Sequence, residues 1–556
     1  MKQQIDYRLI LIAIGGLVFN LLFWNETIGC NFAIFSVLVM IATFTDRDIP
    51  YHNHKLITAI GHLAVAFYLI YNNSVLAIIT WFITMLIYLG NAHFELLKST
   101  GTSLIMGILQ VLSGPYGIIK KLLDTKLGKV NIKPVIRPAK YILLPFVMVS
   151  IFCFLYSIAN PIFAKYTHTI ANSIRDFFVN IFSFFFVDIS IEKFLFILFG
   201  CAVTAGIIVG IKSKTLSDIE LGSEDQLERR RRDLKRPSFG YEFRTLLAGN
   251  LIKRKMALKT ENIIGVISFA ALNMLLLLLN GIDVATLWLN KAIETSKNFS
   301  AELHDGTYTL IFSIVIAMLI IVFFFSGNLN FYRKNKWIKL LAYIWMAQNI
   351  FLVASVFHRD YDYIFNHGLT YKRIGVLVFA TLSLIGLITV YIKVAKHKTT
   401  FYLYRVNSKI WYVLLISLSF VNWDVLIVSY NINQLDKIGV DAEHLMSFSD
   451  KTLPLLEKNR DQLTKHITSY HHYEPIETDV VLEVPDTVSA ATDSLTKAKP
   501  MSELERKTLE TKNAQDEFNK QLDRRINWFL KRQPIGSGLS FSYLEWETAK
   551  VLKYKK

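Results

Sequence analysis

The chain has 556 residues, of which 53% are hydrophobic and only 19% are charged, and its mean hydropathy is +0.36. These values lie outside the usual range of soluble globular domains and indicate an integral membrane protein. The formal net charge of +17 does not point to a nucleic-acid partner, because residues 434–556 carry 19 basic and 20 acidic side chains and the whole basic excess lies in the apolar part.

Eleven apolar segments in residues 1–433 are each about long enough to cross a bilayer as a helix. The sequence therefore predicts an all-α fold: a polytopic helical membrane protein of about 11 transmembrane helices with a small, soluble α-helical tail. The predicted spans are 7–24, 28–45, 56–72, 74–92, 141–159, 194–211, 262–280, 308–325, 338–357, 374–394 and 410–430.

Lysine and arginine are concentrated in every second loop between these spans. The loops at 93–140 and 212–261, and the turns that follow spans eight and ten, hold most of them. By the positive-inside rule these loops face the cytoplasm, which places the N-terminus inside. With eleven spans the C-terminal tail then lies outside the cytoplasmic membrane, and an even number of spans would reverse that side.

Two basic runs are placed to contact lipid headgroups. One is a run of four arginines in a predicted cytoplasmic loop, which we expect to anchor the topology at the membrane surface. The other lies near the end of a broken amphipathic stretch at 104–123, which suits either a helix lying on the inner leaflet or a buried packing helix. The residues concerned are Arg229, Arg230, Arg231 and Arg232, and Lys120 and Lys121.

The chain changes character after residue 433. Residues 434–472 predict short soluble helices, and 473–500, with three prolines among Thr, Ser and acidic residues, predict a flexible strap. Residues 501–556 predict C-terminal helices. This tail is too small and interrupted for a large core of its own.

The first C-terminal helix, 501–532, is highly charged. Ser502 and Glu505 form a capping-box pattern at its start. Its apolar positions make an imperfect stripe, which predicts that the helix packs on the outer face or on a partner. The alternative is a self-contained hairpin with the final helix at 542–553.

Polar residues unusual for a lipid environment gather near the predicted outer ends of spans eight to eleven. Asp424 is the most informative, because it lies about two turns inside span eleven, where a carboxylate costs a few kcal/mol unless it is paired. We expect Arg359 or Arg373 to pair with it, either in a functional site or in a purely structural ion pair. The candidate binding residues are His304, Asp305, Arg359, Tyr363, His367, Arg373, Asn422, Asp424 and Asn431.

The sequence predicts neither a metal site nor a cofactor. His and carboxylate residues do cluster on the predicted cytoplasmic side, but they lack an HExxH-like spacing. They are Asp46, Asp48, His52, His54, His93 and Glu95. The chain has no GxxxxGK[ST] loop, kinase signature or GxSxG elbow, so ATP-driven transport and serine hydrolysis have no support from motifs.

Residues 300–460 contain a recognisable pattern. It comprises Arg359, Tyr363, the Gly368-Leu369-Thr370 triplet and Arg373, then Asn422, Asp424 and Tyr430-Asn431-Ile432. In these positions the chain resembles a bacterial membrane family described only as domain of unknown function 4173. The resemblance implies a protein of the bacterial cytoplasmic (inner) membrane, but no activity, because that family has none established.

Two classes of function fit these observations. The first is a non-enzymatic scaffold, regulator or subunit of a cell-envelope assembly, with membrane lipid and other envelope proteins as partners. The second is a transporter or envelope enzyme that handles an ion, lipid or lipid-linked substrate in an outer-face cavity around Asp424, Arg359 and Arg373. One clear intramembrane Asp is little charge for a pathway, which favours the first class.

Overall fold

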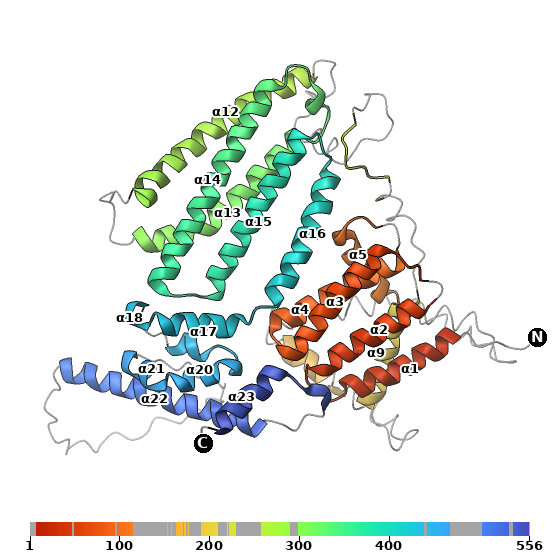
Figure 1. Cartoon of the computed structure of the whole chain (residues 1–556), viewed down its shortest axis with the longest axis vertical. Coiled ribbons are helices and arrows are strands. Elements are labelled where there is room, and N and C mark those ends of the chain that lie inside the picture. Colours follow the sequence, from red (N-terminus) through yellow and green to blue (C-terminus); the bar gives the residue numbers. More distant parts are fainter. Residues whose placement is uncertain are drawn as a thin grey trace, which may run out of the picture.

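A computed structural model describes residues 7–46, 49–94, 97–114, 191–209, 222–228, 257–289, 299–438, 442–467, 503–532 and 538–554, with Glu220 and a few positions between 149 and 176. Apart from one bridge between Gln226 and Lys398, the regular structure of these residues is helical (Figure 1). The predicted all-α class is confirmed. The helices form two bundles and a C-terminal domain that lies across one end of them.

The first group of helices, here called the N-terminal bundle, is held by close backbone approach. A Cβ atom added to Gly90 would lie 1.9 Å from the Ser103 carbonyl oxygen, and one added to Gly107 would lie 1.8 Å from that of Leu86. Small residues let membrane helices approach in this way. The helices are α1 (Tyr7–Phe23), α2 (Cys30–Thr45), α3 (Asn53–Tyr71), α4 (Val75–His93), α5 (Thr100–Leu112) and α9 (Ile191–Ile208).

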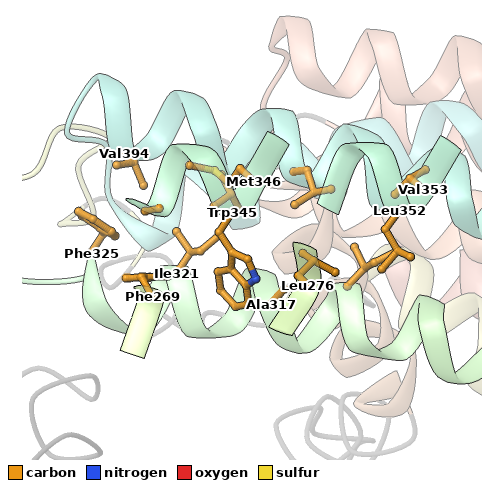
Figure 2. Packing of buried hydrophobic residues seen from close by; sticks show 14 of the residues in the cluster. Phe269, Leu276, Ala317, Ile321, Phe325, Trp345, Met346, Leu352, Val353 and Val394 are labelled. Carbon is orange, nitrogen blue, oxygen red and sulfur yellow. The ribbon is translucent and has the colours of Figure 1, made fainter. Parts of the chain in front are cut away.

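The second group, the C-terminal bundle, is built around large apolar side chains. Figure 2 shows Phe269, Phe325 and Trp345 in this core, and the rings of Phe269 and Trp345 lie 5.4 Å apart. The helices are α12 (Ala257–Asp283), which continues as a π-helical turn (Val284–Trp288), α13 (Phe299–Phe324), α14 (Lys336–His367), α15 (Tyr371–Ala395) and α16 (Thr400–Ser419).

Helix α16 joins the two bundles, because it packs on α15 and also on α3, α4 and α5. A second tie lies at the end of the bundles that holds the α15–α16 turn. There the segment 222–228 forms an ion pair between Asp225 and Arg405 and accepts a 2.9 Å hydrogen bond from the Thr399 backbone N–H. Just before it, Glu220 accepts a 3.1 Å bond from the backbone N–H of Lys98, between α4 and α5.

The C-terminal domain, residues 423–554, begins where the chain bends by 63° after α16. Its core contains Leu456, Leu463, Phe518 and Leu522, which are fully buried. The domain comprises α17 (Trp423–Asn433), α18 (Leu435–Ile438), α19 (Ala442–Met446), α20 (Leu453–Lys458), α21 (Arg460–His466), α22 (Glu503–Arg532) and α23 (Tyr543–Tyr554).

Helix α22 is packed, but against the rest of its own domain, and not on the outer face of the bundles that the sequence predicted. It lies against α20, α21 and α23. The Arg525 guanidinium donates hydrogen bonds to the carbonyls of Met446 and Phe448, at 2.6 and 2.9 Å, and to the Asp450 carboxylate at 2.6 Å. The helix is therefore held by burial of its apolar face and by the hydrogen bonds that Arg525 donates to these carbonyls and to the carboxylate.

The chain is a multi-span membrane protein. Five of the described helices are long and apolar enough to cross a bilayer, and the bent pair α16–α17 would make a sixth. The five are Asn53–Tyr71, Val75–His93, Leu258–Trp288, Lys336–His367 and Tyr371–Ala395. The helices that match predicted spans one, two and eight contain shorter apolar stretches: Arg8–Phe23, Cys30–Thr45 and Thr309–Phe324.

Predicted span 410–430 is wrong as a single helix. Helix α16 ends at Ser419, and Asn422 starts α17 by accepting a 3.5 Å hydrogen bond from the backbone N–H of Val425. An Asn at the N-cap terminates one helix and begins the next. Apolar composition continued across this break, so hydropathy alone did not reveal it.

Some predictions fall outside the described residues. They concern all but a few positions of span 141–159, the strap at 473–500 and the six basic residues expected at lipid headgroups. In the described half of 104–123, α5 is a packing helix whose face with Met106, Gly107 and Gln110 is buried.

Candidate functional site

Asp424 lies at the start of α17, just after the bend that divides the predicted span 410–430. It is partly exposed, and its carboxylate accepts a 2.5 Å hydrogen bond from the hydroxyl of Tyr371 at the start of α15. A carboxylate in the first turn of a helix is also stabilised by the helix dipole. The predicted pairing of Asp424 with Arg359 or Arg373 is therefore wrong, because the Tyr371 hydroxyl and the helix start stabilise this carboxylate and both arginines have other partners.

Arg359 has a different partner. It forms an ion pair with Asp283, and the two side chains are 13% and 2% exposed. The pair joins α14 to the end of α12. Asp283 lies just beyond the predicted span 262–280, and it was not among the candidates because nothing in the sequence marks which helices become neighbours.

Arg373 clamps the turn between α14 and α15. Its guanidinium donates a 2.8 Å hydrogen bond to the His367 carbonyl and a second bond to the Gly368 carbonyl, and it lies 4.2 Å from the ring centroid of Tyr363. The Tyr363 ring is stacked on His367 at 4.3 Å. Gly368 has φ 81° and ψ 178°, a conformation that residues with a side chain rarely adopt.

Asn431 fastens this turn to α17. Its side-chain oxygen accepts a 2.7 Å hydrogen bond from the Leu369 backbone N–H, and its amide donates a 3.0 Å bond to the Leu369 carbonyl. Thr370 caps α15 by accepting a 3.4 Å bond from the Arg373 backbone N–H. The pattern that ran from Arg359 to Asn431 is thus a set of helix ties and turn contacts.

The structure does not bring all nine candidate residues into one cavity. Tyr363, His367, Arg373 and Asn431 gather at the α14–α15 turn, Asp424 and Asn422 lie at the start of α17, and Arg359 faces α12. His304 and Asp305 belong to α13, but their side chains are outside the described residues.

A cluster that the sequence did not reveal surrounds Lys451. Its ammonium donates a 2.6 Å hydrogen bond to the Asn72 side chain, between α3 and α4. Burial lowers the pKa of Lys451 to about 8, although the nearby carboxylates of Glu545 and Asp424 oppose the shift. We call Lys451, Asn72, Glu545, Asp424 and Tyr371 the Lys451 cluster; it lies where the C-terminal domain meets both bundles.

A second polar network is buried inside the N-terminal bundle. His62, in the middle of α3, contacts the Thr84 hydroxyl at 2.9 Å and the Ser36 hydroxyl at 3.0 Å, and the Trp81 indole donates to Ser36 at 2.8 Å. Near the end of α2, the Lys55 ammonium donates to the Thr43 carbonyl at 2.9 Å. These contacts tie α2, α3 and α4 together. A His in the middle of predicted span 56–72 was a visible signal for this network.

The chain belongs to a family described as a domain of unknown function (DUF4153). The family model matches residues 57–459, from α3 to the end of α20. This match overturns the resemblance to domain of unknown function 4173, which rested on turn and cap residues. Such residues fix local backbone geometry and identify a family poorly. No curated protein and no solved structure matches the chain.

Within this DUF4153 chain, the described His, Cys, Asp and Glu residues form no group of three or more that could hold a metal ion. On the predicted cytoplasmic side, Asp46 forms an ion pair with Arg8 at 3.0 Å, and His93 contacts the Ile207 carbonyl at 2.7 Å. Asp48 and Glu95 lie outside the described residues. The polar groups brought together here are arranged to hold helices to one another and to seat the C-terminal domain.

Proposed function

We propose that this protein is a non-enzymatic scaffold or subunit of a cell-envelope assembly in the bacterial cytoplasmic membrane. Its C-terminal domain is then a rigid platform for envelope partners. The observation that carries the proposal is that this domain is fixed to the ends of both bundles, and not attached by a single connection.

The contacts with the N-terminal bundle come from three parts of the domain. Lys451 bonds to Asn72, and the amide of Asn73 donates a 2.9 Å hydrogen bond to the Glu545 carboxylate. The Ser540 hydroxyl accepts a 2.9 Å bond from the backbone N–H of Thr27, between α1 and α2. Several charge-assisted bonds from separate elements hold a surface in one orientation better than a single bond would.

The contacts with the C-terminal bundle involve α17. Asn431 holds the α14–α15 turn, and Asp424 accepts the hydrogen bond from Tyr371. With the chain also continuous from α16, the domain cannot turn relative to this bundle without breaking these bonds. A platform of this kind suits partner binding, which loses less entropy when the surface is already ordered.

Charge supports an outer location for the platform. The described turns at the opposite end of the C-terminal bundle, between α13 and α14 and between α15 and α16, carry Arg333, Lys334, Lys396 and Lys398 (Figure 1). The positive-inside rule favours the cytoplasm for those turns. This orientation puts the N-terminus inside and the C-terminal domain outside.

The transporter or envelope-enzyme alternative loses support, because Arg359 and Arg373 are used in helix and turn contacts. Of the three residues proposed to line a cavity, Arg359 is paired with Asp283, Arg373 holds the α14–α15 turn, and Asp424 belongs to the Lys451 cluster. We therefore propose the scaffold role alone.

The test combines topology with crosslinking in native membranes. A reporter active only in the cytoplasm, fused after Lys556, should give no signal. A photo-crosslinking amino acid at Trp528, which is 57% exposed on α22, should give an adduct with one recurrent envelope protein. The matched control is Phe518 on the same helix, which is fully buried and should crosslink only within the chain. A cytoplasmic signal, or adducts from Trp528 that are only intramolecular, would contradict the proposal.

A further inference from the structure

Helix α23 has two different faces. Thr548, Ala549 and Leu552 are 5%, 7% and 3% exposed and face the C-terminal domain. The other face is a stripe at helical spacing in which Trp546 is 47% exposed and Tyr554 is 82% exposed. The members of this α23 stripe are Tyr543, Trp546, Glu547, Lys550, Val551 and Tyr554, and they line a shallow hollow of about 420 Å³.

The α23 stripe is continuous with the exposed face of α3, which is the face opposite the other helices of the N-terminal bundle. On that surface Ile57, Ile60 and Phe67 are 60%, 59% and 56% exposed, as expected of the lipid-facing side of a membrane span. At its end the Tyr71 ring is stacked on the Tyr543 ring at 5.4 Å, with planes 15° apart, and Tyr543 lies 5.9 Å from Trp546. An unbroken row of rings therefore leads from the span onto α23.

The length of α3 fixes the depth of this row. Its 19 residues rise about 28 Å at 1.5 Å per residue, which is about the thickness of the hydrocarbon core. Tyr71, the last residue of α3, then lies at the edge of that core. The bond from Asn73 to Glu545 holds the first turn of α23 at the same level.

The residue types in the stripe suit the boundary between acyl chains and headgroups. Tryptophan and tyrosine concentrate at this depth, because their rings are apolar and their N–H or O–H groups need a polar partner. The Lys550 ammonium lies 5.2 Å from the Trp546 ring centroid, and Lys553 is in the last turn. Ammonium groups beside aromatic rings at the surface attract lipid phosphates.

We infer that the α23 stripe is a phospholipid-binding surface that holds the C-terminal domain against the headgroup region of the membrane. The aromatic rings sit between headgroups and acyl chains, and Lys550 faces the phosphates. Lipid is the occupant because the stripe extends a lipid-facing surface at the same depth. The inference does not depend on which leaflet is involved, and therefore not on the proposed function.

The test uses the full-length protein in nanodiscs of phosphatidylcholine brominated either near the headgroup or near the chain end. The difference in tryptophan fluorescence between the unchanged protein and the Trp546→Phe variant gives the emission of Trp546. We expect shallow bromines to quench this signal more strongly than deep bromines do. Ile60→Trp is the matched control, because Ile60 is 59% exposed near the middle of α3, and its added emission should show the reverse order.

A second reporter keeps the test independent of Trp546. Tyr554→Trp adds a fluorophore at the most exposed position of the stripe, and its added emission should also be quenched best by shallow bromines. Quenching of both signals by aqueous iodide without quenching by brominated lipid would overturn the inference in favour of a water-exposed face. Protection of both signals from either quencher would overturn it in favour of a protein contact.

Discussion

The two bundles hold their helices together by different means. In the N-terminal bundle, Gly90 and Gly107 bring α4 and α5 into backbone contact, and His62 links α2, α3 and α4 through hydrogen bonds. In the C-terminal bundle, Phe269 and Trp345 belong to a continuous core of large apolar side chains, and hydrogen bonds such as the 2.8 Å bond from Gln348 to Asn273 add to it.

This difference follows from the lipid environment. Lipid chains are as apolar as leucine, so helices do not associate in a membrane merely to leave water. They associate through close packing or through polar contacts that lipid cannot supply. Both bundles contain polar contacts, but the N-terminal bundle adds close backbone packing and the C-terminal bundle adds a core of large side chains, so the two should respond to different substitutions.

The largest effect is expected in the C-terminal core. Phe269→Ala should lower the free energy of unfolding by about 3–5 kcal/mol, because it leaves a cavity among the surrounding side chains. The measurement is equilibrium unfolding in detergent micelles, followed by tryptophan fluorescence. The control on the same helix is Leu278→Ala, at a position 66% exposed, which should change the stability little. Equal losses in the two variants would contradict a packed core.

A somewhat smaller effect is expected where the backbones touch. Gly107→Ala should destabilise the protein by about 1–3 kcal/mol, because the added methyl group would meet the Leu86 carbonyl and force α5 away from α4. Gly375→Ala in α15 is the control, since nothing lies within 4 Å of the added carbon there. It should stabilise the protein slightly through helix propensity. The same unfolding assay should therefore give changes of opposite sign.

The hydrogen-bonded network in the N-terminal bundle offers a third test. His62→Leu leaves the hydroxyls of Ser36 and Thr84 with fewer partners, and we expect a loss of about 1–2 kcal/mol. Ile60→Leu on the lipid-facing side of the same helix should have almost no effect. If His62→Leu were as stable as the unchanged protein, the hydrogen bonds of His62 would not contribute to holding the N-terminal bundle together.

The last test concerns the junction between the bundles and the C-terminal domain, where the effect depends on pH. Burial lowers the pKa of Lys451 from 10.5 to about 8, so the folded protein loses this proton before the unfolded chain does. The cost of burying the ammonium is fully present below about pH 8 and is relieved as the pH rises towards 10.5.

Over this interval the protein should therefore gain stability relative to the Lys451→Met variant, measured as the difference in unfolding midpoints across an alkaline series. Lys458→Met, which removes an exposed charge from the neighbouring α20, is the control. A constant difference between the Lys451→Met and unchanged proteins at every pH would refute the titration.

The sequence predicted best where composition decides the structure. Of the eleven predicted spans, five correspond to described helices long and apolar enough to cross a bilayer. The apolar stripe of α22 correctly indicated a buried face, with Phe518 and Leu522 fully buried, but not the surface on which it packs. The prediction failed where a few polar residues determine the structure. Asn422 caps a new helix within the predicted span 410–430, and hydropathy did not reveal this break, so Asp424 was assigned to the interior of a continuous helix.

The candidate site was harder to predict, because its residues are joined by tertiary contacts. Nothing near Asp283 in the sequence identifies Arg359 as its neighbour, and Lys451 lies 379 positions from Asn72. His62 lies inside the predicted span 56–72. A polar side chain at that depth is expected to have a hydrogen-bonding partner, so the argument used for Asp424 also applied to His62.

The segment 222–228 precedes the C-terminal bundle in the chain, yet it is fastened to the α15–α16 turn through Asp225 and Arg405. The C-terminal domain, in turn, is fastened to the loops of the N-terminal bundle. Each half of the polypeptide thus contains a segment that binds the other half. These contacts, in addition to the connection between residues 228 and 257, align the two bundles. Two separately translated fragments divided in that interval should therefore find each other in the membrane and copurify, which makes the chain a candidate for split-protein complementation.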